Sequence, residues 1–562
     1  MVDQSERAGA GPSAALRTVA SRFRTITLGI ILLAAPAIGL ASEDPSRQSH
    51  GAVAASVSGN NGSTSDHRSY EVLQEDFESG SEVTQACLTC HVNAAKQIQA
   101  TEHWNWEYAN PKTGQMLGKR HVVNNYYISA LANLPTCTVC HVSYDWEETG
   151  FEFESEENVD CLVCHDGTGV YRKIKFHSSG RPCLICHDVF PEGSRFPEIG
   201  LTEVAQNVGL PRRENCGTCH FRGGGGDAVK HGDMDSSLTN PPRSLDVHMD
   251  ANGLNFVCTT CHSTDQHAVK GSRYSPEASD TKGFRIPANR PDERGTCQSC
   301  HGLAPHPKDA KLNDHTDRVA CQTCHIPAFA RGGIATKTWW DWSTAGKQTP
   351  DGKNMVKIGP FDRPVYTTEK GDFGWAMNVT PKYVWFDGRI EYTLINDKID
   401  PTRRVIINTF LGGPDEPEAR IWPVKSFRGK QPYDMVNKTL AVPELAGRDE
   451  NAFWRNFDWN KAVAAGMKAV GAPYSGKLGF VETEMLWPIN HMVAPAEDAL
   501  KCDACHAEKG RLDGVSGFYM PGRHLYPLID KIGGALLGLT LSGVAIHAML
   551  RVYTRRRRRE RT

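Results

Sequence analysis

One short motif uses every cysteine of this chain. The sequence has 562 residues and 18 cysteines, and all 18 belong to nine Cys-x-x-Cys-His motifs. The cysteine pairs are Cys87 and Cys90, Cys137 and Cys140, Cys161 and Cys164, Cys183 and Cys186, Cys216 and Cys219, Cys258 and Cys261, Cys297 and Cys300, Cys321 and Cys324, and Cys502 and Cys505. No cysteine remains outside the motifs for a separate disulfide or a free thiol.

Each motif carries the three groups that covalent haem attachment requires. Two thiols form thioethers to the haem vinyl groups, and the histidine that follows them binds the iron. Zinc also binds Cys-x-x-Cys pairs, but a zinc site does not require a histidine directly after every pair. The sequence therefore predicts a multihaem c-type cytochrome with nine haems, or eight if the Cys183 motif carries none. The predicted proximal ligands are His91, His141, His165, His187, His220, His262, His301, His325 and His506.

The N-terminus has the features of an export signal. Arg17, Arg22 and Arg24 precede an apolar stretch over 26–40, and the small residue Ala41 follows it. This order predicts a signal peptide over 1–41, with an uncleaved anchor as the alternative. Covalent haem attachment takes place outside the cytoplasmic membrane in bacteria, so both features predict a periplasmic protein.

The C-terminus predicts a membrane anchor. Residues 532–550 contain no acidic or basic residue apart from His547, and an arginine-rich tail follows over 552–562. A transmembrane helix over 528–551 is therefore expected, with the tail in the cytoplasm and the body on the periplasmic face of the inner membrane. His547 either packs in this helix or binds a b-type haem shared with a partner. Because haem propionates add to the formal charge of −2, nucleic acid is not an expected partner.

The rest of the chain divides unevenly. Residues 42–80 predict a flexible spacer that buries no core, and 81–339 a multihaem domain with eight motifs. Residues 340–490 have no cysteine and predict a lid or wall, with a β hairpin at Asp387-Gly388 and a helix over 449–470. Residues 491–527 carry the last motif. The expected fold class is mainly α with extensive loops, a stacked haem array, a small β hairpin and the terminal helix.

Histidines outside the motifs supply further iron ligands. Of 22 histidines, 13 lie outside the motifs. Four of them belong to the spacer or to the membrane-proximal end: His50, His67, His524 and His547. The other nine are predicted distal ligands, with a hydrogen-bonded structural role as the alternative for each: His103, His121, His177, His231, His248, His267, His306, His315 and His491.

A glycine-rich loop follows the fifth motif. Four glycines at 223–226 precede the neighbours Lys230 and His231. Glycines let a backbone pass close to a porphyrin face or turn sharply. Two interpretations stay open on residue chemistry: Lys230 binds an iron, or the loop lies at the surface and presents only His231.

Several segments resemble one known family. CGTCHFRGGGGDAVKHGDMDSSL, LDVHMDANGLNFVCTTCH, LNDHTDRVACQTCHIPAFARGGIATK and NVDCLVCHDGTG are similar to the octahaem tetrathionate reductases, which are related in haem arrangement to hydroxylamine oxidoreductase. The resemblance covers Cys87 to His506. It implies that Lys230 binds the iron of one haem, the one on Cys137-Cys140-His141.

Two departures from this family concern the haem number and the substrate. The family has eight haems, so the Cys183 motif is the expected addition, with His177 or His121 as its extra ligand. The family also has a cysteine near its catalytic haem. In this chain, Tyr127 stands at about the position where we expect that cysteine. Both departures leave the expected fold and path of electron transfer unchanged, but they count against tetrathionate as the substrate.

Together these features predict a membrane-anchored periplasmic reductase. Electrons would pass along bis-histidine haems to the Lys230 haem, where tetrathionate, nitrite or hydroxylamine is reduced. His248 is the candidate proton donor, and the candidate partners of a small anionic substrate are Arg222, Lys425, Arg428 and Lys430. A quinol-linked membrane cytochrome or another electron-transfer partner would supply electrons. The alternative function is a non-catalytic electron conduit between the quinone pool and periplasmic redox partners.

Overall fold

The structure, a computed structural model, describes residues 62–144, 146, 150–171, 200–284, 295–447, 449–523 and 526–561. All of them belong to the unit formed by residues 55–562. The predicted signal peptide, the Cys183 motif and His177 lie outside the described residues. Two parts are named here: the haem-motif region, residues 62–335 with 491–523, and the sheet region, residues 336–490.

Short helices form the haem-motif region. A Cys-x-x-Cys-His motif places its three functional groups at i, i+3 and i+4, which share one face of a helix, so a single turn suffices. The helices are α1 (Gly80–Leu88), α2 (Ala94–Gln99), α3 (Leu134–Cys137), α4 (Leu162–His165), α5 (Leu201–Gln206), α6 (Arg213–His220), α7 (Cys258–Cys261), α8 (Gln298–His301), α9 (Ala310–His315) and α10 (Cys321–His325). Two small antiparallel pairs accompany them, β1 (Tyr108–Ala109) with β2 (Met116–Leu117) and β3 (Thr264–Asp265) with β4 (Ala268–Val269).

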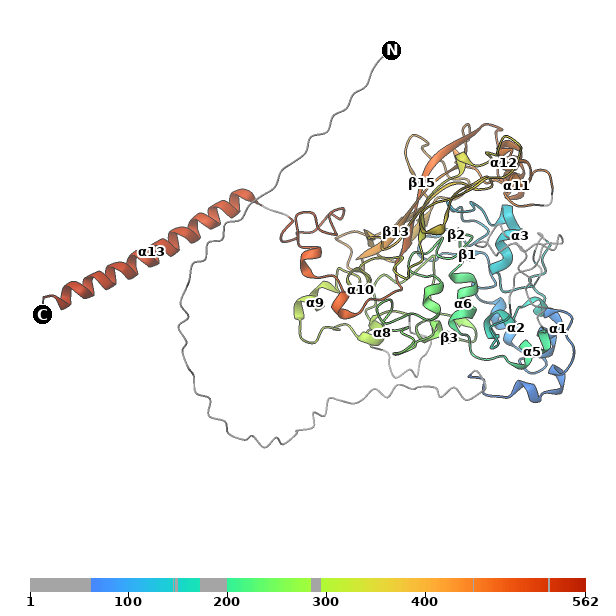
Figure 1. The fold of residues 1–562 in the computed structure, drawn as a ribbon, viewed down its shortest axis with the longest axis horizontal. Coiled ribbons are helices and arrows are strands. Elements are labelled where there is room, and N and C mark those ends of the chain that lie inside the picture. Colours follow the sequence, from blue (N-terminus) through green and yellow to red (C-terminus); the bar gives the residue numbers. More distant parts are fainter. Residues whose placement is uncertain are drawn as a thin grey trace, which may run out of the picture. The chain divides into compact units, whose positions relative to one another are not determined.

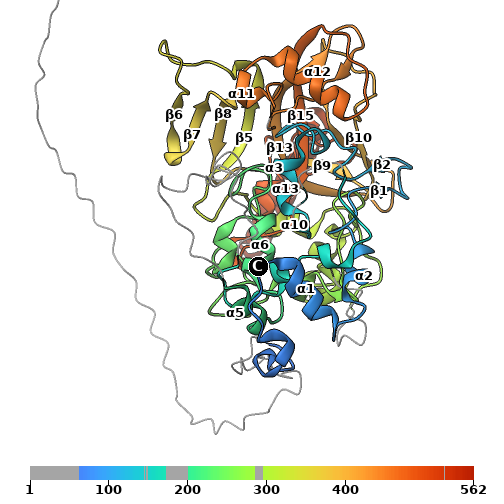
Figure 2. The same ribbon diagram turned by 90° about the vertical axis from the view of Figure 1, so that its right-hand side faces the viewer.

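The sheet region contains a sheet of nine strands. They are β5 (Thr336–Asp341), β6 (Val356–Ile358), β7 (Pro364–Thr367), β8 (Gly371–Ala376), β9 (Lys382–Phe386), β11 (Val405–Ile406), β13 (Arg420–Asp434), β14 (Thr439–Leu440) and β15 (Leu478–Pro488). The main order is β11-β15-β13-β5-β8-β7-β6, and β9 and β14 also pair with β13. Figure 2 shows β6, β7, β8 and β5 side by side. The expectation of a mainly α fold with one small hairpin is therefore wrong for this region.

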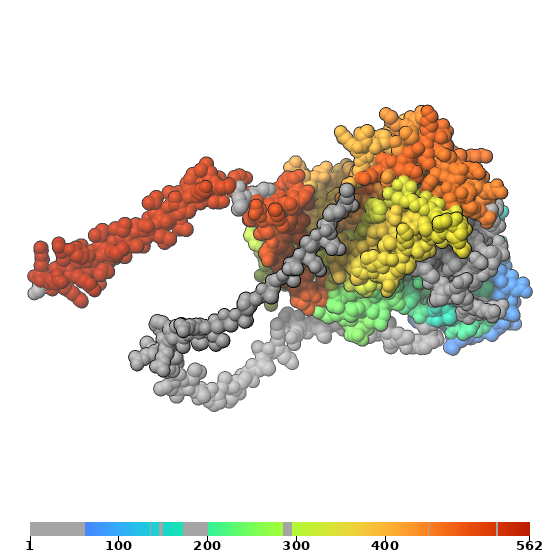
Figure 3. Space-filling view, turned by 45° about the horizontal axis from the view of Figure 1, so that its top comes forward, coloured from blue at the N-terminus to red at the C-terminus, as the bar shows by residue number. Residues whose placement is uncertain are grey.

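The long strands β13 and β15 carry the sheet. They pair antiparallel from Val424 opposite Pro488 to Asp434 opposite Leu478. Their side chains join a large apolar core in which Trp340, Trp342 and Phe427 are fully buried. Figure 3 shows the surface of this region, coloured yellow to orange, beside the green surface of the haem-motif region.

The predicted hairpin at Asp387-Gly388 is wrong. A turn forms there, and the Asp387 carboxylate accepts a hydrogen bond from the Arg389 amide (2.8 Å). However, β9 pairs with β13, and β10 (Ile390–Tyr392) pairs with β12 (Asn408–Phe410). Both arms of the turn are short, and Phe386 and Ile390 are buried. Strands from elsewhere in the chain therefore complete their ladders, which turn chemistry does not reveal.

The predicted helix over 449–470 forms two helices. They are α11 (Phe453–Asn456) and α12 (Trp459–Ala469), separated by Phe457 in the left-handed conformation (φ 54°). The carboxylate of Asp458 then caps α12 by accepting from the amides of Asn460 and Lys461. Both helices pack their apolar residues into the core of the sheet region.

The predicted spacer over 42–80 is structured in its described part. Residues His67–Ser69 and Glu71–Leu73 form 3-10 helices, and Leu73 and Phe77 are buried against α1 and α5 residues. The prediction failed because these two apolar positions stand in a polar segment without a helical or strand period.

The C-terminal helix α13 (Pro527–Arg559) has 33 residues and is labelled in Figure 1. Its length and apolar composition suffice for it to cross a membrane, and all of its described residues are exposed. The apolar helix predicted over 528–551 is therefore present.

Candidate haem-binding and active site

Seven motif histidines face a second histidine across a similar gap. The distances between ring centroids are 6.4 Å for His91 and His67, 6.4 Å for His165 and His267, 6.2 Å for His220 and His103, 6.2 Å for His262 and His491, 5.9 Å for His301 and His248, 6.1 Å for His325 and His306, and 6.2 Å for His506 and His315. Each pair joins the histidine of one motif to a histidine outside the motifs.

This spacing fits an iron between the two rings. A metal–imidazole bond is about 2 Å long, and the ring centre lies about 1 Å beyond the bonding nitrogen. Two imidazoles on opposite sides of one iron therefore have centroids about 6 Å apart. Together with the two cysteines of each motif, the seven pairs could hold seven bis-histidine haems c.

Hydrogen bonds at the other ring nitrogen orient several of these histidines. The Nδ1 atoms of His165 and His262 lie 2.8 Å from the carbonyl oxygens of Gly209 and Lys270. His491 Nδ1 lies 3.1 Å from Asp233 Oδ2. A proton on Nδ1 that is donated to such an oxygen leaves Nε2 as the free base that a metal needs. These contacts therefore present Nε2 toward the gap.

The structure divides the nine predicted distal ligands. Six of them face a motif histidine: His103, His248, His267, His306, His315 and His491. His121 bonds Glu107 (2.8 Å) and faces no motif histidine that the structure describes, and the ring of His231 packs on Trp487 at 5.3 Å. His177 lies outside the described residues.

His67 is a facing histidine that the sequence analysis missed. Assigning residues 42–80 to a spacer removed it from the set of distal ligands. Asp66 begins the 3-10 helix that carries His67, since its carboxylate accepts a hydrogen bond from the Arg68 amide (3.2 Å). The Asp66 cap signal, followed by the apolar residues Leu73 and Phe77, could have identified an ordered segment here.

Neighbouring cysteines connect the motifs into a series. The side chains of Cys87 and Cys161, of Cys216 and Cys258, and of Cys297 and Cys321 interact directly. The side chains of Cys164 and Cys216, of Cys261 and Cys297, and of Cys324 and Cys505 also lie near one another. The motifs that begin at Cys87, Cys161, Cys216, Cys258, Cys297, Cys321 and Cys502 thus follow one another in space.

The glycine-rich loop lies where the two regions meet. Gly224, Gly225 and Gly226 have positive φ angles of 80°, 91° and 157°. A Cβ atom at Gly225 would overlap the ring of Tyr127, and one at Gly224 would come within 3.1 Å of the side chains of Lys230 and Tyr126. The glycines are therefore needed because the loop passes directly against these side chains.

Buried donors hold the backbone beside Lys230. Lys425 Nζ donates to the carbonyls of Val229 and Lys230, each at 3.0 Å, and contacts Thr336 Oγ1 at 2.6 Å. The Tyr126 hydroxyl donates to the same Lys230 carbonyl at 2.9 Å. These bonds fix the backbone from which the Lys230 side chain starts.

Lys230 is half-buried, and its amine lies near other cations and an aromatic ring. Its Nζ lies 4.7 Å from the centroid of Trp487, and the guanidinium carbon of Arg273 lies 4.2 Å from the same ring. Burial, followed by the charges of Arg273 and Lys119, holds the pKa of Lys230 well below its usual value. The Cys140 side chain interacts electrostatically with this amine.

The side chain of His141 lies in an aromatic cage. Its ring centroid is 4.7 Å from that of Trp146 and 5.0 Å from that of Trp104, with Phe151 and Phe153 also in contact. Its Nε2 lies 2.6 Å from the Trp104 carbonyl oxygen, and its Nδ1 lies 2.8 Å from Ser143 Oγ. The cysteine side of this motif, rather than the His141 ring, is where the Lys230 amine is found.

Other predicted site residues have different surroundings. The Tyr127 ring packs on Trp340 at 5.3 Å and on Trp342 and Trp454 at 6.1 Å, whereas its neighbour Tyr126 bonds Lys230. His248, the predicted proton donor, faces His301. Among the predicted anion-binding residues, Lys425 is fully buried, whereas Arg222 and Lys430 are half-buried and Arg428 is exposed.

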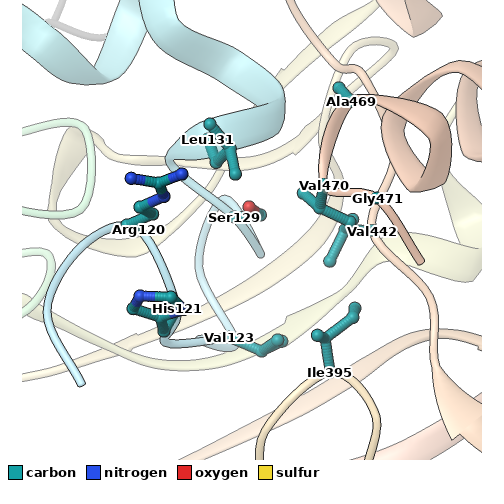
Figure 4. A pocket seen from close by; sticks show the side chains of 10 residues that line it. All are labelled: Arg120, His121, Val123, Ser129, Leu131, Ile395, Val442, Ala469, Val470 and Gly471. Atoms are coloured by element: carbon teal, nitrogen blue, oxygen red, sulfur yellow. The ribbon is translucent and has the colours of Figure 1, made fainter. Parts of the chain in front are cut away.

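A cavity of 410 Å³ lies near the predicted ligand His121. Arg120 and His121 line one side, and Leu131, Val442 and Val470 lie across from them (Figure 4). The Glu107 carboxylate lies 3.3 Å from the Arg120 guanidinium and 2.8 Å from His121 Nε2. The positive charge at this cavity is therefore already balanced by a carboxylate.

Comparisons with known proteins agree with this arrangement. The family described as "Cytochrome c bacterial" matches residues 337–509. The crystal structure of octaheme cytochrome c from Shewanella oneidensis is 39% identical, with a TM-score of 0.69, over 81% of this chain and 97% of that one. This chain belongs to the octahaem cytochrome c family.

Family membership confirms the resemblance found in the sequence. Octahaem cytochromes carry covalently bound haem c, so the chain is a multihaem cytochrome with an electron-transfer or reductase role. It has one Cys-x-x-Cys-His motif more than the eight haems in the name of its relative. No curated protein matches the chain significantly.

Proposed function

We propose that this protein is a membrane-anchored periplasmic reductase that reduces a small sulfur or nitrogen oxyanion beside Lys230. The seven histidine pairs would hold the electron-transfer haems. Cys137 and Cys140 would hold the haem at which Lys230 is a ligand, and His141 would bind the same iron once its Nε2 leaves the Trp104 carbonyl. The observation that carries this proposal is the half-buried Lys230, whose amine lies 4.7 Å from the centroid of Trp487 and near Cys140. Bound haem supplies one-electron redox chemistry at each site.

The protein's own residues have separable tasks in this proposal. The Nδ1 hydrogen bonds of His165, His262 and His491 keep Nε2 available as a ligand. Lys425 and Tyr126 fix the Lys230 backbone. The series of neighbouring motifs passes through Cys216 and His220, and the His220 side chain interacts with Lys230. Electrons would thus reach Lys230 from the middle of the series.

A non-catalytic electron conduit is the second candidate. It is favoured by the high proportion of paired motif histidines, because iron with two histidine ligands has no open position. In either case the helix α13 would anchor the protein in the inner membrane, and a quinol-linked cytochrome would be the electron donor.

The test is Lys230→Ala, with His231→Ala as the matched neighbour. Lys230→Ala should leave haem attachment intact, convert one haem from a lysine-ligated to a high-spin state in electron paramagnetic resonance, and reduce turnover of nitrite, hydroxylamine and tetrathionate by about a hundredfold. His231→Ala should keep the lysine signal. If the spectrum and turnover of Lys230→Ala equal those of the wild type, the reductase proposal is wrong and the conduit is favoured.

A further inference from the structure

The last haem motif lies close to the start of the helix α13. His506 Nδ1 lies 3.1 Å from the carbonyl oxygen of Pro521. The Arg523 guanidinium donates to the carbonyls of Leu512 and Val515, at 2.6 and 3.0 Å. These bonds hold the chain against the body as far as Arg523. The helix begins four residues later, so its first turn starts within about 14 Å of Arg523.

A buried apolar cluster fixes the same segment on the sheet region. Leu512, Val515 and Met520 pack there with Tyr383 of β9 and Ile421 of β13. Packing therefore sets the position of this segment, and only three residues of chain separate Arg523 from α13. Where α13 enters a membrane, this end of the body lies at the membrane surface, because the short link leaves it no other place.

Two exposed tyrosines stand on either side of this link. Tyr519 and Tyr526 are 61% and 55% exposed, and their rings stack with centroids 6.2 Å apart. Leu528 and Ile529, in the first turn of α13, are exposed as well. Tyrosine collects where lipid meets water, because its ring is apolar and its hydroxyl is polar. The uncharged stretch of α13 begins at Ile532, about 9 Å along the helix from Tyr526, so both rings can reach the headgroup layer.

The last motif is also one end of the series of haem motifs. The Leu500 amide, just before this motif, donates to the Cys324 carbonyl of the preceding motif at 2.9 Å. The rings of His506 and His315 face each other at 6.2 Å, as an axial pair would. From here the series runs back through α10, α8 and α7 to α6, which leads into the glycine-rich loop and Lys230. One path of motifs therefore connects the end beside α13 with the candidate active site.

We infer that residues 502–526 rest on the lipid surface, with the rings of Tyr519 and Tyr526 in the headgroup layer, and that electrons from the membrane enter the protein at this motif. The inference rests on the proposed membrane anchor and deepens the proposed function by naming the entry point of its electrons. A membrane quinol that becomes a quinone releases two protons and two electrons, and the electrons would pass into the series one at a time.

The first test is photolabelling of the full, haem-loaded protein in phosphatidylethanolamine–phosphatidylglycerol vesicles that contain a phospholipid with a diazirine in its headgroup. Mass spectrometry should find label on Tyr519 and Tyr526 at a yield about tenfold above that on Leu210. Leu210 is the matched control, because it is 66% exposed and follows Gly209, whose carbonyl contacts His165 in another part of the series. Label on α13 without label on either tyrosine would overturn the inference. Absence of label on α13 itself would refute the proposed membrane anchor, and this inference with it.

The second test is the order in which the haems are reduced. His315→Ala should make the haem held by His506 high-spin, which marks it in the optical spectrum. A ruthenium tris-bipyridyl complex linked to a lipid headgroup should, under light, reduce this high-spin signal before the low-spin signals, and the same complex in solution should not. In His67→Ala, which marks the other end of the series, the high-spin signal should follow the low-spin ones. The same order with both forms of the complex would overturn the entry point. Neither test requires turnover, so failure of the reductase proposal is distinguished from failure of this inference.

Discussion

The haem-motif region and the sheet region are held together in different ways. In the sheet region, Trp340, Trp342, Phe427 and Phe453 are fully buried in one large apolar core. This core also takes in haem-motif residues such as Tyr126 and Ile128. The other apolar clusters of the haem-motif region are small, and the conspicuous feature there is the set of histidine pairs about 6 Å apart. The first region packs side chain against side chain, whereas the second leaves space for porphyrins between its side chains.

This difference explains where the candidate active site lies. A region built around porphyrins has few rigid side-chain contacts of its own to hold a lysine in place. The sheet region supplies them, because Lys425 on β13 bonds the Lys230 carbonyl and Trp487 on β15 covers its amine. The reactive position is therefore built from both regions, because the rigid sheet holds the loop of the haem-motif region.

The largest expected effect tests whether the core of the sheet region is independent of haem attachment. Phe427 is fully buried and stacks on Tyr126 at 4.3 Å. Phe427→Ala should lower the free energy of unfolding by about 4 kcal/mol, because it leaves a cavity in a packed core. Chemical denaturation followed by tryptophan fluorescence measures this loss, and the haem-to-protein ratio should stay the same. A loss of attached haem in this variant would contradict the distinction between the two regions.

The second effect concerns the contact between the regions. Lys425→Met should leave the Val229 carbonyl without this donor and the Lys230 carbonyl with only the Tyr126 hydroxyl, at a cost of about 2 kcal/mol. Turnover should fall, and the spectrum of the Lys230-associated haem should change while the bis-histidine signals persist. Lys430→Met on the same strand is the control. Unchanged turnover and spectra in Lys425→Met would show that the sheet does not position Lys230.

The third effect is a pH dependence confined to the sheet region. The Ser475 hydroxyl and the amides of Asn437, Ser475 and Val436 donate to Asp434, and these bonds outweigh its burial and lower its pKa to about 2. A lowered pKa means that the stabilisation is present above the unfolded value of 3.8 and is lost as the pH falls through about 2.

Asp434→Asn should therefore be less stable than the wild type by about 2 kcal/mol at neutral pH, and this difference should vanish in acid. Unfolding curves recorded at both pH values measure it. An equal difference at the two pH values would mean that the carboxylate charge is not what these amides stabilise.

The smallest effect lies at the N-terminal end of the series. His67→Ala should convert one low-spin haem to high-spin, because His91 would lose the histidine that faces it. Stability and turnover should change little, since the pair lies far from Lys230 along the series of motifs. Electron paramagnetic resonance measures the spin state, with His50→Ala as the control. A spectrum identical to that of the wild type would remove His67 from the set of ligands.

Local chemistry made much of the site predictable. The haem motifs, the glycine loop and the apolar C-terminal helix are each recorded in a few consecutive residues, and the resemblance to the octahaem family rests on such segments. The sheet was not predictable in this way. The strands β9 and β10 lie on either side of the turn residues Asp387-Gly388. They do not pair with each other, because each pairs with another strand of the chain, β13 and β12 respectively. Arg273 carries no motif and stands out only because its guanidinium meets the Lys230 amine at the ring of Trp487.

The sequence by itself determined the covalent chemistry of this protein, because two cysteines and a histidine at i, i+3 and i+4 meet on a single turn of helix whatever surrounds them. The tertiary structure decided which histidine faces which motif, as with His262 and His491, and that Lys230 and Arg273 meet at the ring of Trp487. The physical reason is range. Thioether attachment requires residues that are neighbours in the chain, whereas two facing histidines come from segments that only folding brings together.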